Sequence, residues 1–122
     1  MNLFQKMNFI SHSGKKLDFK IECDALVDKD WDTIAYLISK KIKFRCVTGI
    51  ATGGTKLESA LEKYITKDQG VLLIVDDVIT TGKTMKECKD VNSEWKHGIS
   101  GVVLFARGKC PDWITPVFQL NL

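Results

Sequence analysis

The sequence predicts an α/β fold in which a small parallel sheet is flanked by helices. Two runs of mostly β-branched or large apolar residues, Val71 to Val75 and Gly101 to Ala106, have the length and composition of strands buried on both faces. Apolar residues before and between these runs recur at helical spacing. Strands that alternate with helices form parallel sheets with right-handed crossovers. Because ligands of such sheets bind outside the carboxyl ends of the strands, the functional site is expected there.

Three amphipathic helices are predicted around these strands. Their apolar positions are Trp31, Ile34, Ala35, Ile38 and Ile42 in the first, Leu57, Ala60, Leu61 and Tyr64 in the second, and Met85, Cys88, Val91 and Trp95 in the third. The first helix is expected to start near Trp31, with Asp28 or Asp30 as its cap. The third is expected to continue to Gly98, whose lack of a side chain ends a helix readily.

Two further strands are predicted outside the central runs. Phe44 to Val47 is a short strand between the first two helices. Near the N-terminus, alternation through Leu17, Phe19 and Ile21 predicts a half-buried strand. Trp113, Pro116 and Phe118 are interpreted as residues that cover the sheet edge or a ligand pocket by packing.

Composition limits the class of protein. A chain of 122 residues corresponds to one domain, and 44% apolar with 27% charged residues is ordinary for a soluble globular protein. The net charge of +3 suits anionic substrates, but no block of five or more basic residues favours nucleic-acid binding. The four cysteines form no C-x-x-C pair, so neither zinc nor disulfides are expected. Without a signal region or an apolar run of about 20 residues, a cytoplasmic location away from membranes is expected.

The run from Val71 to Met85 carries the strongest functional signal. A buried strand leads into Asp76 and Asp77, then into a loop rich in hydroxyl groups, Thr80 to Thr84, just before a helix. The unpaired N–H groups at a helix start favour anions, so a phosphate is the expected ligand. A Walker A loop is the competing interpretation, but Asp77 stands where that motif needs a glycine. Two carboxylates suit ribose hydroxyls, directly or through Mg²⁺, better than the terminal phosphates of ATP.

This run resembles the motif that binds phosphoribosyl pyrophosphate (PRPP) in type I phosphoribosyltransferases: an apolar strand, two acids, two apolar residues and a T-T-G-x-T loop. The resemblance implies that Asp76 and Asp77 are catalytic and hold the ribose hydroxyls, either directly or through Mg²⁺. It also implies that Thr80, Thr81, Gly82, Lys83 and Thr84 hold the 5′-phosphate. The competing interpretation is an ordinary strand, turn and helix with surface aspartates.

A glycine-rich loop earlier in the chain extends the resemblance. In the family a short glycine loop after a strand precedes the PRPP motif and holds the pyrophosphate, and here its place is taken by Thr48, Gly49, Ile50, Ala51, Thr52, Gly53 and Gly54. Glycine permits close approach of the backbone to a ligand. The alternative is a tight turn that needs positive φ at Gly53 or Gly54.

Two more segments resemble orotate phosphoribosyltransferases in particular. Residues 1–24, with Ser13, Gly14 and Lys16, are similar to the segment that forms a hood over the base, and residues 25–122 would form the α/β core. Lys16 would reach the base or the pyrophosphate, and Arg107, after the strand that ends at Ala106, would lie near the base. A solvated Lys16 and a surface Arg107 are the alternatives. Lys96-His97-Gly98 is similar to part of a family loop, but it follows the PRPP motif, and coincidence is the favoured interpretation.

One departure from the family is large. Orotate phosphoribosyltransferases have a further strand and a long loop rich in lysine and histidine before the PRPP strand, whereas only Thr55 to Gly70 intervenes here. That loop closes over the substrate and supplies cations to the leaving pyrophosphate. Lys56, Lys63 and Lys67 lie in the interval and are expected to be solvated.

Two functions follow from these observations. The first is a compact phosphoribosyltransferase that uses Mg²⁺, takes PRPP and a nucleobase such as orotate, and forms a homodimer as its relatives commonly do. The second is a binding module that retains the phosphate site, has lost turnover and senses PRPP or a nucleotide. An ATP-dependent kinase is disfavoured by Asp77.

Overall fold

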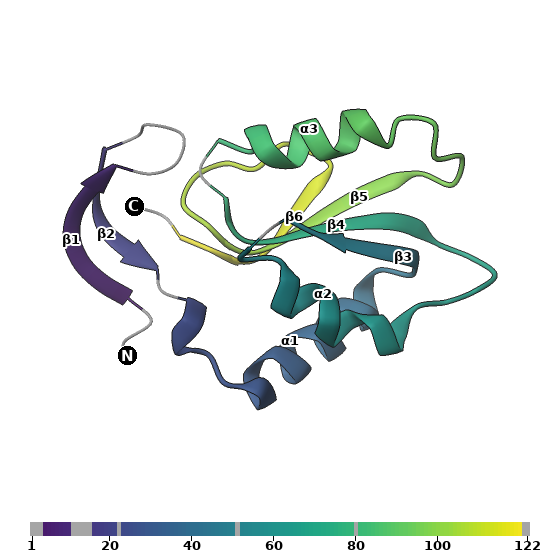
Figure 1. The fold of residues 1–122 in the computed structure, drawn as a ribbon, viewed down its shortest axis with the longest axis horizontal. Helices are drawn as coiled ribbons and strands as arrows, with labels where there is room; N and C mark the ends of the chain where they lie inside the picture. Colours follow the sequence, from purple (N-terminus) through teal and green to yellow (C-terminus); the bar gives the residue numbers. More distant parts are fainter. Residues whose placement is uncertain (1–3, 11–15, 22, 51, 80, 121–122) are drawn as a thin grey trace.

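The computed structural model describes residues 4–10, 16–21, 23–50, 52–79 and 81–120, the first two ranges and Asp24 by their backbone alone (Figure 1). The expected parallel sheet is present, with strand order β3-β4-β5-β6. Its strands are β3 (Phe44–Gly49), β4 (Val71–Ile79), β5 (Ile99–Ala106) and β6 (Ile114–Gln119). All three pairings are parallel, so the carboxyl ends of the strands lie at one edge of the sheet.

Helices cover both faces of this sheet (Figure 1). The helical elements are η1 (Cys23–Ala25), α1 (Asp28–Lys41), α2 (Thr55–Leu61), η2 (Glu62–Tyr64) and α3 (Lys83–Val91). On one face α1 and α2 pack on Leu73 and Val75 of β4. On the other face Met85 of α3 packs with Leu72 and Ile74. Both faces of β4 are therefore buried, which explains its unbroken apolar run.

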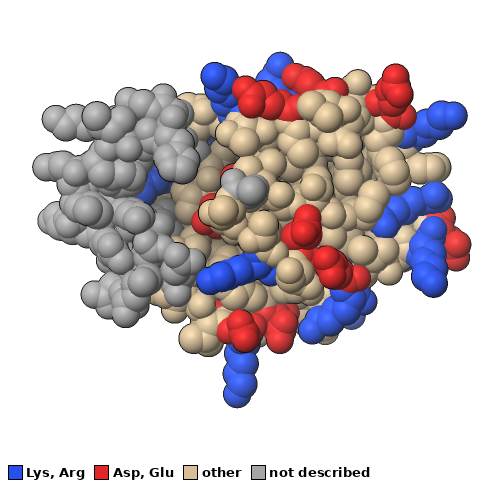
Figure 2. Space-filling view, viewed as in Figure 1, with Lys and Arg blue, Asp and Glu red and all other residues tan. Residues whose placement is uncertain are grey.

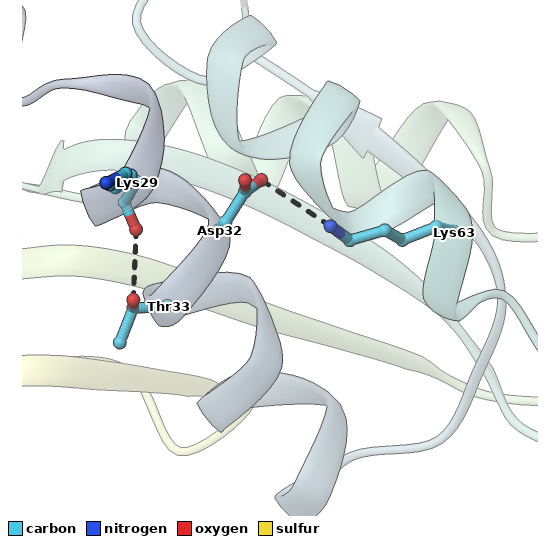
Figure 3. A network of polar contacts seen from close by, with 4 residues as sticks. All are labelled: Lys29, Asp32, Thr33 and Lys63. Carbon is cyan, nitrogen blue, oxygen red and sulfur yellow. Dashed lines mark hydrogen bonds and ion pairs between the residues drawn. The ribbon is translucent and has the colours of Figure 1, made fainter.

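The contact between α1 and α2 combines buried apolar side chains with an exposed ion pair. Lys63 of η2, which directly follows α2, lies 3.6 Å from Asp32 of α1 (Figure 3). Within α1 itself, the Thr33 hydroxyl donates to the Lys29 carbonyl at 2.9 Å. Both members of the ion pair are more than half exposed, so its contribution is a few tenths of a kcal/mol. Burial of Ile38 and Leu61 in the shared core supplies most of the stabilisation.

Two helix boundaries differ from the sequence prediction. The first helix starts at Asp28, with Val27 as the cap residue, and Asp30 assists by accepting a hydrogen bond from the Val27 N–H at 2.9 Å. The third helix ends at Val91, not near Gly98, because the Asn92 side chain bonds the Cys88 carbonyl at 2.8 Å and the chain turns. Val91, predicted to be apolar core, is 85% exposed.

The strands are longer and more numerous than predicted. The strand at Phe44 continues to Gly49, and β4 includes Asp76 and Asp77, because the ladder with β5 extends to Ile79. The sequence prediction missed β6 as a strand. It forms an edge of the sheet among the described residues, where Pro116 is tolerated because no strand of this sheet pairs with β6 on its outer side and requires an N–H there. Phe118 of β6 stacks on Phe105 with ring centroids 5.3 Å apart, so the predicted packing role is correct.

The N-terminal segment forms an antiparallel hairpin of β1 (Phe4–Ile10) and β2 (Lys16–Ile21). In Figure 1 it stands beside the edge of the sheet at which the parallel strands end. The predicted strand through Leu17, Phe19 and Ile21 is therefore confirmed. Ser13 and Gly14, and the side chain of Lys16, lie outside what the structure describes.

Charged side chains of both signs are interspersed on the face shown in Figure 2. No helix in the described part of the chain is long and apolar enough to cross a membrane. Cys46, Cys88 and Cys110 form no disulfide among the described residues. The described residues contain no cluster of three or more side chains of the metal-binding types.

A matched pair of valines tests the placement of the core. Val103 is fully buried in the α3-side core, whereas Val91 is 85% exposed. We expect Val103→Ala to lower the free energy of unfolding by about 2 kcal/mol and Val91→Ala to change it by less than about 0.5 kcal/mol, both measured by urea unfolding. Similar losses of unfolding free energy in both variants would contradict the exposure of the Val91 side chain at the end of α3.

Candidate functional site

The site is built around two aspartates at the carboxyl end of the buried strand β4. Leu72 to Val75 are buried, whereas Asp76 and Asp77 are partly exposed where the strand leaves the core. The Asp77 N–H donates to Asp76 Oδ1 at 2.8 Å, and the Val78 N–H donates to Asp77 Oδ1 at 2.7 Å. These bonds orient both carboxyl groups at the end of β4.

The glycine loop lies directly against Asp77. A Cβ atom on Gly53 would stand 2.3 Å from Asp77 Oδ2 and 2.4 Å from its Cγ, so only glycine fits there. Residues 52–54 form a turn, but neither Gly53 nor Gly54 has positive φ, so the turn does not need glycine for its backbone conformation. Close approach is what requires glycine in this loop: the Asp77 carboxylate lies against Gly53, and backbone atoms of Val75 and Ile50 lie against Gly54.

Two hydrogen bonds hold the glycine loop to the sheet and to α2, and a third lies within the loop. The Ile50 N–H donates to the Val75 carbonyl at 2.9 Å, just before the aspartates, and the Gly54 N–H donates to the Ile50 carbonyl at 2.7 Å. The Gly49 N–H donates to Glu58 Oε1 at 2.7 Å. Sequence reasoning missed Glu58; the available signal was an acid in the first turn of the helix that follows a glycine loop.

The predicted phosphate loop leads into α3. Gly82 precedes the helix with a φ of 81°, a left-handed conformation that favours glycine. Thr81, Lys83 and Thr84 are exposed around this turn, and the Lys83 N–H faces Thr81 Oγ1 at 3.4 Å. Thr80 lies outside the described residues, as does Ala51 of the glycine loop.

The remaining predicted site residues flank these loops. Thr48 is half-buried in β3, beside Ile74, and Thr52 is exposed in the turn before α2. Arg107 follows β5 and is partly buried, and its backbone N–H donates to the Ile79 carbonyl at 3.5 Å. Arg107 is thus next to the end of β4. Lys96-His97-Gly98 lies before β5, at the opposite edge of the sheet, which agrees with the interpretation that its likeness to a family loop is a coincidence.

Electrostatics distinguish the two carboxyl groups. Burial, reinforced by a hydrogen bond to Asp77 and by the charge of Asp77, raises the pKa of Asp76 to about 8. Two neighbouring carboxylates that are partly removed from water resist ionising together. A bound cation would remove this resistance, because it neutralises the pair.

The aspartate pair offers ligands of the kind that Mg²⁺ prefers. Mg²⁺ in proteins is usually held by one or two carboxylates, several waters and substrate phosphates, without a full cage of side chains. Asp76 and Asp77 supply two such carboxylates, and the raised pKa of Asp76 marks a place where positive charge is favourable. The residues present therefore suit the ion.

Comparisons with solved structures identify the fold. The chain superposes on orotate phosphoribosyltransferase from Aeropyrum pernix with a TM-score of 0.74 and 18% identity, covering 96% of this chain and 88% of that one. With the UMP synthase of Leishmania donovani the TM-score is 0.76 and the identity is 19%, and the match covers 97% of this chain and 34% of that one. For a hypoxanthine phosphoribosyltransferase from Staphylococcus aureus they are 0.54 and 17%, with 79% and 76% covered.

The fold is thus that of the phosphoribosyltransferases. Within that class, the structure is similar to orotate phosphoribosyltransferases over nearly its whole length. No family model matches the sequence, and no curated protein is significantly similar to it in sequence.

The raised pKa of Asp76 predicts how stability depends on pH. The unfolded chain loses this proton near its ordinary pKa of 3.8, whereas the folded protein keeps it up to about 8, so stability falls as pH rises through that window. We expect Asp76→Asn to stabilise the protein at pH 8.5 by about 1–2 kcal/mol relative to pH 5, a figure reduced for partial solvent exposure. Urea unfolding at both pH values measures this. The exposed Asp68→Asn is the control, and equal effects of Asp76→Asn at both pH values would contradict the assignment.

The contact between Gly53 and Asp77 is testable by a double-mutant cycle. Gly53→Ala forces its new methyl group into the carboxylate and is expected to cost about 1–3 kcal/mol of unfolding free energy. Adding Asp77→Ala removes the obstructing atoms, so the two effects should couple by at least about 1 kcal/mol. Gly108→Ala is the control, since a Cβ there meets nothing within 4 Å. Additive effects would show that the two residues do not touch.

Proposed function

We propose that this protein binds PRPP with Mg²⁺ and transfers its phosphoribosyl group to a nucleobase, with release of pyrophosphate. The observation that supports the proposal is the contact of Asp77 with Gly53, which joins the acidic pair to the glycine loop at one sheet edge. Arg107 and the start of α3 adjoin the same edge. A phosphate, a ribose and a pyrophosphate need such neighbouring subsites.

Each part of the site has a distinct role in this proposal. The N–H groups at the start of α3, with the hydroxyls of Thr81 and Thr84, hold the 5′-phosphate, because a helix N-terminus favours anions. Asp76 and Asp77 hold the ribose hydroxyls, while the backbone from Gly49 to Gly54 holds the pyrophosphate. The proposal assigns recognition of the base to Arg107 and Lys16, with orotate as the first candidate base.

Catalysis would come from positioning and charge. Breaking the glycosidic bond to pyrophosphate builds positive charge on the ribose, which nearby carboxylates stabilise. Bound Mg²⁺ would neutralise the departing pyrophosphate. The base nitrogen is held in line with C1, so that a bimolecular encounter becomes a step within one complex.

A second function, binding of PRPP or a nucleotide without turnover, is favoured by one observation. The interval between the glycine loop and β4 contains only α2, η2 and a short turn. Lys63 within it is engaged with Asp32 at 3.6 Å, and Lys56 and Lys67 are exposed. No described residue of this interval forms a closing loop.

We propose a homodimer in which a segment of the partner covers the site. Light scattering with and without PRPP tests this oligomeric state.

Calorimetry and turnover assays separate these functions. Purified protein with Mg²⁺ is titrated with PRPP, and pyrophosphate release is measured with orotate, uracil, hypoxanthine and adenine in turn. The proposed enzyme binds PRPP and releases pyrophosphate only with the correct base. Binding without release from any base supports the binding module, and the absence of PRPP binding would contradict the enzyme and a module that binds PRPP.

Neutralised aspartates test the assignment of the site. Asp76→Asn with Asp77→Asn is expected to weaken PRPP binding in the presence of Mg²⁺ by at least about 100-fold, because both ribose and metal contacts are lost. Asp68→Asn, an exposed acid at the opposite edge of the sheet, should leave affinity unchanged. Unchanged affinity in the double variant would place the ligand elsewhere.

A further inference from the structure

Glu58 of α2 holds the glycine loop at both of its ends. Its side-chain Oε1 accepts a hydrogen bond from the Gly49 N–H at 2.7 Å, and its backbone N–H donates to the Gly54 carbonyl at 2.9 Å. Gly49 is the last residue of β3, and Gly54 immediately precedes α2. One residue therefore fixes both the point where the loop leaves the sheet and the point where it enters the helix.

The Gly49 N–H needs an acceptor because β3 is an edge strand among the described residues, paired with β4 on one side only. The next N–H along the chain, that of Ile50, donates to the Val75 carbonyl of β4 at 2.9 Å. Successive N–H groups of a strand point to opposite sides, so the Gly49 N–H points away from β4. The Glu58 carboxylate takes the place of a neighbouring strand there, and the N–H would otherwise be partly buried without an acceptor.

Close packing ties this bond to the shape of the whole loop. A Cβ atom on Gly49 would stand 2.4 Å from the Gly54 oxygen and 3.1 Å from Glu58 Cβ, so the first turn of α2 lies directly against the start of the loop. Between these two ends lies Gly53, which contacts the Asp77 carboxylate. Because the loop is short, holding its ends also holds Gly53 at the acidic pair.

A carboxylate is an unfavourable acceptor in a loop that is proposed to hold an anion. A glutamine at position 58 would supply an equivalent acceptor oxygen without the charge. The negative charge of Glu58 lies within hydrogen-bond distance of the loop backbone, where it repels an anion bound to that backbone. The side chain therefore has two opposite effects: it orders the loop, and it limits how tightly the loop can hold pyrophosphate.

We propose that Glu58 is a positioning residue that acts through Gly49 to order the pyrophosphate subsite, while its charge favours release of this product. The inference rests on the proposed function, since it takes the glycine loop as the pyrophosphate subsite. Both bonds of Glu58 described above end on the glycine loop. Binding of ribose and of the 5′-phosphate, assigned to the acidic pair and to the start of α3, should therefore not depend on Glu58.

Calorimetry in the presence of Mg²⁺ tests this role with two probes, inorganic pyrophosphate and ribose 5-phosphate. Glu58→Met removes the acceptor and is expected to weaken pyrophosphate binding at least about fivefold, with the affinity for ribose 5-phosphate unchanged. Glu58→Gln keeps an acceptor and removes the charge, so its pyrophosphate affinity should equal that of the unaltered protein or exceed it by up to about tenfold. Glu58→Ala serves if Glu58→Met fails to fold.

Matched controls and a readout without ligand accompany these titrations. Glu62 is an exposed acid one turn further along, and Glu62→Met and Glu62→Gln should change neither affinity. Amide hydrogen exchange at Gly49, followed by NMR, should accelerate at least about tenfold in Glu58→Met and stay slow in Glu58→Gln.

The outcomes separate this inference from the proposed function. If the unaltered protein binds neither PRPP nor pyrophosphate, the proposed function fails and the inference fails with it. If the unaltered protein binds both, three results would overturn the role of Glu58 alone. These are unchanged pyrophosphate affinity in Glu58→Met, equal weakening of both probes, and a loss in Glu58→Gln as large as that in Glu58→Met.

Discussion

The close approach of the Asp77 carboxylate to Gly53 is the constraint on which the site depends. β4 is buried by α1 and α2 on one face and by α3 on the other, so its path through the core is fixed. The strand delivers Asp77 to the sheet edge, and the glycine loop closes over it with no room for a side chain at position 53. Core packing thereby sets the distance between the acidic pair and the loop.

This arrangement has an energetic cost that a ligand can relieve. Asp76 shares its partly buried position with Asp77, and burial with the neighbouring charge raises its pKa to about 8. In the free protein Asp76 therefore resists ionisation more than an ordinary aspartate does. Binding of a cation with a polyol favours the ionised pair, so the proton should leave as the ligand binds. The two neighbouring carboxyl groups are therefore unfavourable for the free protein and become favourable when a ligand binds, as is common where function and stability conflict.

Sequence reasoning predicted most of the fold because local and tertiary signals agree there. The buried runs of β4 and β5 and the apolar face of α1 all appear where periodicity placed them. Sequence reasoning failed where one contact or one residue determines where an element ends or whether it forms. Asn92 ends α3 by bonding the Cys88 carbonyl, and Pro116 concealed β6 because a proline argues against any strand but an edge strand. The contact of Asp77 with Gly53, the bond from Glu58 and the raised pKa of Asp76 depend on distances between distant segments, which spacing along the chain does not encode.

The titration of Asp76 tests the central claim most directly. Carbon-13 NMR of the labelled aspartate carboxyl groups, with Asp76→Asn for assignment, gives this pKa in the free protein and in the presence of Mg²⁺ and PRPP. We expect about 8 in the free protein and a value lower by at least about 2 units with both ligands present. A free-protein value near the ordinary 3.8, or a raised value that the ligands leave unchanged, would contradict the assignment of the acidic pair as the ligand site.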